Sequence, residues 1–136
     1  MDLLIEWTED FSVGVVEIDN QHKKLVKMIN ELHQAMKQGK GNSHAGDIIN
    51  RLVDYSIYHF QTEEKYFDKF DYPQTEKHKK IHTDFVNKVS VFKNEFENNE
   101  VMLTIDILNF LSSWLRKHIL GDDMEYSDFF IENGLK

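Results

Sequence analysis

The chain has 136 residues and a mass of 16.2 kDa, which fits one domain with a substantial core and leaves no room for a second catalytic domain. Acidic residues outnumber basic ones by 24 to 16, so the net charge of −8 and the pI near 5.3 argue against nucleic acid or an anionic membrane as a partner. Because the chain has no cysteine, disulfides, thiolate zinc sites and iron–sulfur clusters are excluded, and any metal must be bound by nitrogen and oxygen.

Residues 1–18 are expected to form an arm that packs onto the rest of the chain through apolar and aromatic side chains such as Trp7 and Phe11. Acidic residues stand near the start, where a signal peptide carries positive charge, so export is not expected. The most apolar stretch, 101–115, is interrupted by polar residues such as Asp106 and cannot span a bilayer. We therefore expect a soluble, cytoplasmic protein with no membrane partner.

Four segments show the 3.6-residue spacing of apolar side chains that is typical of amphipathic helices. The first is expected to begin after Asp19, which can act as an N-cap, and to end at the turn residues 39–43. The second is expected to begin near Asp47 and to end at 71–73, because Pro73 disfavours helical geometry in the residue before it.

The third segment is expected to begin near Thr75, whose hydroxyl can cap the helix, and to end near 98–99. The fourth is expected to run over 101–120, with Gly121 as its C-terminal stop. Four helices joined by short loops predict an all-α, antiparallel up-down-up-down four-helix bundle. We expect a single domain over 1–136, in which the bundle occupies 19–120 and a C-terminal loop and short helical tail occupy 121–136.

Histidines and a carboxylate occupy inward positions of these helices where a bundle ordinarily has leucine. His59 and Glu63 are four residues apart, as are His78 and His82. On a helix this separation leaves both side chains on one face, about 6 Å apart along the axis. Every helix presents at least one such inward side chain: His22, His59, Glu63, His78, His82 and His118. These side chains can therefore meet in the bundle interior.

A single inward histidine is more often a hydrogen-bonded core residue than a metal ligand. Burying this whole set without partners would cost several kcal/mol, however, whereas a metal would satisfy all of its members together. His33 lies about 16 Å along the helix from His22, so we expect it to be a core or bundle-end residue outside the site. His44 lies in a turn-rich segment and is expected to be solvated.

The ligand types are compatible with iron, manganese, zinc or copper. Five imidazoles exceed the number that a tetrahedral structural zinc needs, and such zinc sites commonly use thiolates. A pair of metal ions accounts for the number of ligands better than one ion does.

Several motifs follow one another at separations that are highly specific when taken together. They are Trp7, Phe11-Ser-Val-Gly-Val15, Ile18-Asp-Asn-Gln-His22, His59-x-x-x-Glu63, His78-x-x-x-His82 and His118-Ile-x-x-x-Asp123. In this pattern the chain resembles the hemerythrin family, specifically its single-domain bacterial members, over essentially its whole length. No ligand position departs from the family pattern.

The resemblance implies a cofactor of two iron ions (Fe2+/Fe3+) joined by an oxo or hydroxo bridge. It implies that one iron is bound by His78, His82 and His118, the other by His22 and His59, and both by Glu63 and Asp123. Helical spacing alone would point Asp123 away from His118, five residues before it, so we expect Gly121 to let the chain turn back. The neighbouring Asp122 is expected to be a solvated loop residue.

The resemblance also implies reversible dioxygen binding, for oxygen storage, transport or delivery, at an open position on the two-histidine iron. A monomer without catalytic residues is expected, with an oxygen-requiring enzyme as a candidate recipient. The residues that match the family's ligand pocket are Leu25, Phe60, Trp114, Leu115 and Ile119, all of which also fit a plain bundle core. Two alternatives stay open: a sensor of O2, nitric oxide or redox state, and a di-iron oxidase or peroxidase. The latter class typically uses Glu-x-x-His motifs, which differ from the spacing here.

Overall fold

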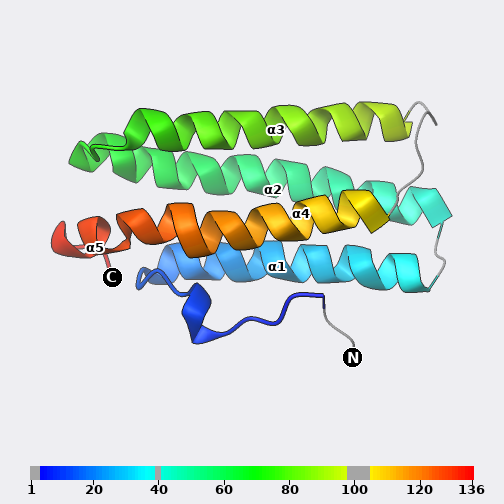
Figure 1. Cartoon of the computed structure of the whole chain (residues 1–136), viewed down its shortest axis with the longest axis horizontal. Coiled ribbons are helices and arrows are strands. Elements are labelled where there is room, and N and C mark those ends of the chain that lie inside the picture. Colours follow the sequence, from blue (N-terminus) through cyan, green and yellow to red (C-terminus); the bar gives the residue numbers. More distant parts are fainter. Residues whose placement is uncertain (1–3, 39–40, 98–104) are drawn as a thin grey trace.

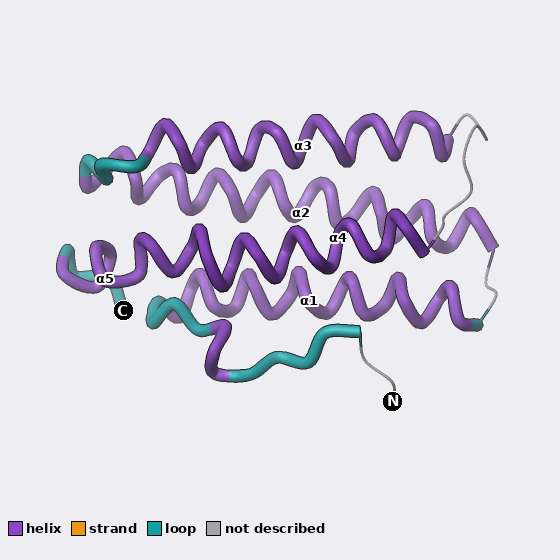
Figure 2. The backbone as a smooth tube through the Cα atoms, in the orientation of Figure 1, coloured by secondary structure: helices purple, strands orange, loops and turns teal. Residues whose placement is uncertain are grey.

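The protein forms an antiparallel four-helix bundle with an N-terminal arm and a short fifth helix (Figure 1). The computed structural model describes residues 4–38, 41–97 and 105–136. The helices are α1 (Val16–Lys37), α2 (Gly41–Phe70), α3 (Thr75–Glu97), α4 (Ile105–Lys117) and α5 (Met124–Glu132). A π-helical turn, His118–Asp123, joins α4 to α5, and the described residues contain no strand (Figure 2). The expected all-α up-down-up-down bundle is thereby confirmed.

The beginning of α1 differs from the expected one. The helix starts at Val16, with Val15 at the N-cap position, so Asp19 lies within the first turn and does not cap the helix. Its carboxylate instead accepts hydrogen bonds from the Val13 N–H at 2.8 Å and from the Ser12 hydroxyl at 2.6 Å. Asp19 therefore fastens the arm to the helix.

The second helix begins earlier than expected, at Gly41 and not near Asp47, so the turn-rich segment belongs to α2. His44 consequently lies in a helix, although its side chain is outside the described residues. The apolar stripe of α2 is buried from Ile48 onward and stabilises the helix, since packing commonly outweighs weak local propensity. The expected start of the fourth helix, near Val101, also lies outside the described residues.

The third helix begins at Thr75 as expected, but the Thr75 hydroxyl donates to the Tyr72 carbonyl at 2.6 Å instead of accepting from the helix. Before it, Asp71 has a φ of 56°, a left-handed conformation that aspartate tolerates better than most residues. The chain therefore reverses sharply between α2 and α3, which brings the C-terminal part of α2 against the N-terminal part of α3.

The arm lies along the bundle and is held by backbone and side-chain contacts. The side-chain amide of Asn30 on α1 accepts from the Ile5 N–H at 3.0 Å and donates to the Ile5 carbonyl at 2.8 Å. Arg116 on α4 donates to the Leu4 carbonyl at 2.8 Å. These contacts join the two helices through the arm.

Aromatic side chains close the end of the bundle at which α5 lies. Phe67 is fully buried and contacts the rings of Tyr72, Tyr126 and Phe130 at centroid distances of 5.0 to 5.5 Å. Close-packed aromatic rings leave little space for water in the interior next to the π-helical turn. No helix in the described part of the chain combines the length and the apolar character needed to cross a membrane.

Candidate metal centre

Seven histidine and carboxylate side chains from α1, α2, α3 and the π-helical turn after α4 meet in the interior. Each has 3% exposure or less: His22 on α1, His59 and Glu63 on α2, His78 and His82 on α3, and His118 and Asp123 on the π-helical turn. The helix spacing works as expected for the i, i+4 pair on α2, where His59 Nε2 lies 2.8 Å from Glu63 Oε1. The structure thus brings together all seven residues that the family resemblance implies as ligands.

The π-helical turn accounts for the position of Asp123. Its hydrogen bonds connect residues five apart, so side chains at i and i+5 share a face, as those at i and i+4 do on an α-helix. His118 and Asp123 both lie in this turn, and His118 Nε2 is 3.1 Å from Asp123 Oδ1. The expectation that Gly121 ends the helix and lets the chain turn is therefore wrong: Gly121 continues the helical path with a negative φ.

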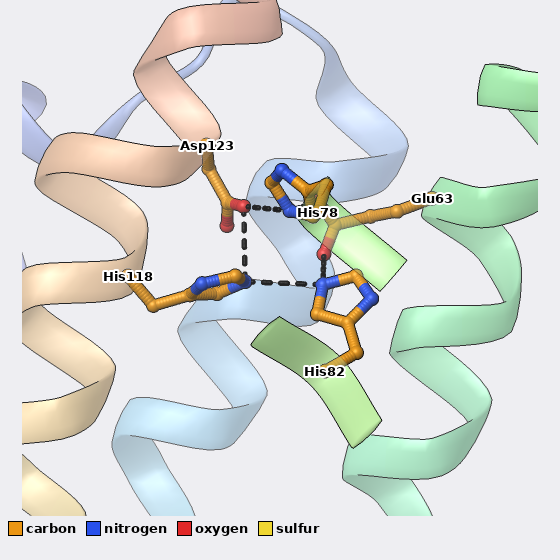
Figure 3. Close-up of side chains that lie close together, drawn as sticks. All are labelled: Glu63, His78, His82, His118 and Asp123. Carbon is orange, nitrogen blue, oxygen red and sulfur yellow. Dashed lines mark hydrogen bonds and ion pairs between the residues drawn. The ribbon is translucent and has the colours of Figure 1, made fainter. Parts of the chain in front are cut away.

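The seven residues form two overlapping groups, in each of which the potential ligand atoms lie within 4.8 Å of one another. One group comprises Glu63, His78, His82, His118 and Asp123, and the other comprises His22, His59, Glu63 and Asp123 (Figure 3 shows the first). Both carboxylates belong to both groups. Each group can hold one metal ion, and the shared carboxylates lie where bridging ligands would be needed.

Asp123 shows this shared position most clearly. Its Oδ1 lies 3.0 Å from His78 Nε2 and 3.1 Å from His118 Nε2, while its Oδ2 lies 2.9 Å from His22 Nε2. One carboxylate oxygen therefore faces each group. Glu63 also contacts both groups: its Oε1 lies 2.8 Å from His59 Nε2 and 3.6 Å from His82 Nε2, and its Oε2 lies 3.6 Å from His78 Nε2.

Most of the polar atoms that converge here lack a hydrogen-bond partner among the described residues. Both oxygens of Glu63 and of Asp123 are buried without a hydrogen-bond partner among the described residues, as are Nε2 of His22, His59 and His78. His82 Nε2 and His118 Nε2 face each other at 3.2 Å, a hydrogen bond that requires one of the two rings to carry a proton on Nε2. Buried polar groups ordinarily find partners, so this convergence fits bound cations. The nitrogen and oxygen donors suit iron among other transition metals.

The carboxylates of the centre are held in the ionised form. Burial alone raises the pKa of Glu63, but the adjoining imidazoles, above all His59, hold it well below its usual value. For Asp123, burial and the charge of Glu63 raise the pKa, and the imidazoles of His118, His22 and His78 more than offset them. Both side chains can therefore bind a metal near neutral pH without first losing a proton.

The imidazoles divide into two kinds. Burial lowers the pKa of His78, but the adjoining carboxylates of Asp123 and Glu63 raise it to about 10. Burial lowers the pKa of His118, but Asp123, Asp122 and Glu63 together outweigh it, so this pKa is also raised. Burial lowers the pKa of His59, and the nearby carboxylate offsets this only in part. Without a metal, His78 therefore carries a proton near pH 7.

Apolar and aromatic residues surround the centre. Phe60 stacks on the ring of His82 at 3.9 Å, and Trp114 stacks on the ring of His118 at 4.5 Å. All five residues expected to line a ligand pocket belong to or pack against one apolar core cluster: Leu25, Phe60, Trp114, Leu115 and Ile119. His33 is partly exposed and lies outside both groups of potential ligands.

Two residues near the centre were missed or misjudged at the level of sequence. Asp122 is not simply a solvated loop residue, because its Oδ2 lies 3.2 Å from His118 Nδ1. The i, i+4 separation of these two residues could have revealed this contact. Gln21 on α1 accepts a hydrogen bond from His59 Nδ1 on α2 at 2.6 Å. No local sequence pattern could reveal this contact between two helices.

The chain matches known proteins over nearly its whole length. The family model described as "Hemerythrin HHE cation binding domain" matches residues 13–129. A bacteriohemerythrin of Pseudomonas aeruginosa is 40% identical over 122 residues, covering 90% of this chain and 78% of the relative. A bacteriohemerythrin of Clostridium acetobutylicum is 32% identical over 126 residues, covering 90% and 98%.

Solved structures agree with the sequence comparisons. The crystal structure of a wild-type hemerythrin superposes with a TM-score of 0.87 at 31% identity, covering 92% of this chain and 96% of that one. A variant of hemerythrin with one leucine replaced by alanine superposes with a TM-score of 0.89 at 30% identity, covering 93% and 97%. Because the family model, the relatives and the fold agree, the chain belongs to the hemerythrin family.

Proposed function

We propose that this protein binds dioxygen reversibly at a di-iron centre, without catalysing its further conversion. Two iron ions in this centre would supply an open binding position and the electrons that reversible dioxygen binding requires. The observation that carries the proposal is the unequal division of ligands: three histidines in one group and two in the other, with two carboxylates common to both. The two-histidine group has one protein ligand fewer, which leaves room for a small exogenous ligand.

The surroundings support binding over turnover. The residues that match the family's ligand pocket are apolar and offer no acid or base to deliver protons to bound oxygen. Leu115 is three residues before His118, and Leu25 is three residues after His22, so each lies about one helical turn from a ligand. Apolar side chains that keep water away from the centre would slow the irreversible oxidation of the iron with release of hydrogen peroxide.

Cycles of oxygenation test this function directly. The protein would be loaded anaerobically with ferrous iron and exposed alternately to air and vacuum while its visible spectrum is recorded. We expect an absorption band of the oxygenated protein that appears and disappears over repeated cycles. Rapid, irreversible oxidation of the iron with release of hydrogen peroxide would contradict the proposal and favour an oxidase.

Replacing Leu115 by alanine is expected to leave iron content unchanged and to accelerate autoxidation several-fold, because the vacated space admits water. Leu115 is buried, so the free energy of unfolding should also fall by about 2–5 kcal/mol. Leu111→Ala is the matched control, since this leucine is equally buried one turn further from His118. If both variants lose oxygenated protein at the wild-type rate, Leu115 does not protect the centre.

Metal binding is expected to release protons near pH 7. The pKa of His78 is about 10 in the metal-free protein, so this imidazole must lose a proton to become a ligand. Metal affinity should therefore rise with pH up to about 10. Protonated His78 stabilises the metal-free fold, and this stabilisation is lost as the pH rises from about 6.5, the ordinary pKa of histidine, to about 10. Calorimetric titration with Fe2+ in two buffers of different ionisation enthalpy measures the release, and equal heats in both buffers would contradict it.

A further inference from the structure

The outer ring nitrogens of the candidate ligands, those that face away from the centre, have different partners in the two groups. In the three-histidine group two of these nitrogens, those of His118 and His82, lie near carboxylates. Asp122 Oδ2 is hydrogen-bonded to His118 Nδ1 at 3.2 Å, whereas Glu64 Oε2 lies 3.6 Å from His82 Nδ1, which is too far for a hydrogen bond. Both carboxylates are partly exposed, with 27% of the side chain accessible.

The two-histidine group has a neutral partner instead. His59 Nδ1 donates to the amide oxygen of Gln21 at 2.6 Å, and Gln21 is 5% exposed. The amide nitrogen of Gln21 donates to the Thr62 hydroxyl at 3.2 Å, which in turn donates to the Tyr58 carbonyl. His22 Nδ1 is buried with no hydrogen-bond partner among the described residues. No carboxylate therefore faces an outer nitrogen of this group in the described structure.

The chain Tyr58–Thr62–Gln21–His59 fixes the orientation of the amide. Because Thr62 takes the amide N–H, the amide oxygen must face His59, and His59 must carry its proton on Nδ1. The lone pair of Nε2 is then directed into the centre. Thr62 thus orients Gln21, and Gln21 selects the tautomer of His59 that can bind a metal.

We propose that Gln21 and Asp122 are positioning residues that make the two halves of the centre unequal beyond their difference in ligand number. A carboxylate that accepts the outer N–H makes the imidazole a stronger donor, whereas a neutral amide does so much less. The three-histidine half accordingly holds its ion more tightly, and the two-histidine half is the more exchangeable. This inference rests on the proposed two-iron centre but not on dioxygen binding.

Chelator-driven release of iron from the anaerobic ferrous protein tests the inference. We expect two phases in the wild-type protein, and only the slow one in His59→Ala, which identifies the fast phase with the two-histidine half. Gln21→Glu should slow the fast phase about 10-fold and leave the slow phase unchanged, whereas Asp122→Asn should accelerate the slow phase about 10-fold. A general loss of structure would change both phases together.

Two further variants keep the inference testable if Gln21→Glu does not fold. Thr62→Val removes the acceptor that orients Gln21 and should accelerate the fast phase alone. Gln38→Glu makes the same chemical change at an exposed position of the same chain, about 25 Å away from Gln21 along α1, and should alter neither phase. If the protein binds two irons but Gln21→Glu, Thr62→Val and Asp122→Asn leave the rates of both release phases unchanged, this inference alone is overturned. A wild-type protein that holds fewer than two irons would overturn the proposed function as well.

Discussion

Replacing Glu63 by alanine is expected to weaken the binding of both metal ions at once, by more than about 100-fold, because a directly ligating group contributes more than an outer partner does. Glu63 belongs to both groups of potential ligands. Its Oε1 lies 2.8 Å from His59 Nε2, and its Oε2 lies 3.6 Å from His78 Nε2. Iron content after loading and desalting should fall well below one ion per chain.

The control for this change is Glu125→Ala, which removes an exposed carboxylate whose contact with Lys77 is 3.8 Å long. Surface ion pairs of this kind contribute at most about 1 kcal/mol, so its iron content should equal that of the wild-type protein. Circular dichroism of both metal-free variants shows whether the helices persist. A folded Glu63→Ala protein that retains two irons would contradict the shared role of this carboxylate.

Replacing His59 by alanine is expected to remove only the ion of the two-histidine half. The loaded protein should contain about one iron instead of two, because the three-histidine group keeps all of its ligands. Dioxygen binding should be abolished, because the open position belongs to the half that is lost. Iron analysis and the oxygenation spectrum together measure both effects.

His33→Ala provides the matched control, because it removes an imidazole of the bundle that lies outside both groups. It should keep two irons and the reversible spectrum. If His59→Ala also kept both, the assignment of His59 to the centre would be wrong. If His59→Ala lost both irons, the two halves would depend on each other more strongly than the ligand sets indicate.

Much of the fold could be predicted because it depends on local periodicity. Leu25, Ile29 and Leu32 repeat at helical spacing on α1, and all three are buried. The helix boundaries were less predictable. Asp19 has the residue type of an N-cap, yet it binds the arm, because the competing donors Ser12 and Val13 come from a segment that is packed against α1 only in the folded chain.

Some of the candidate ligands could likewise be predicted from local spacing, and one could not. The i, i+4 pairs His59–Glu63 and His78–His82 follow from helix geometry, so periodicity alone placed them on inward faces. Asp123 did not follow from it, since five residues after His118 is the wrong face of an α-helix. The family resemblance supplied Asp123, and the π-helical turn over His118–Asp123 provides the physical reason.

Local spacing and composition were thus sufficient to establish the four helices, the absence of thiolate ligands and the inward imidazoles, since each depends on residue type and on positions close together in the chain. The contact of Gln21 with His59 and the division into a three-histidine and a two-histidine group depend on how separate helices pack. Such contacts join residues that lie 38 positions apart or come from different helices, and side-chain periodicity carries no information about them. Packing therefore decides which carboxylate oxygen faces which imidazole, and with it the inequality of the two halves.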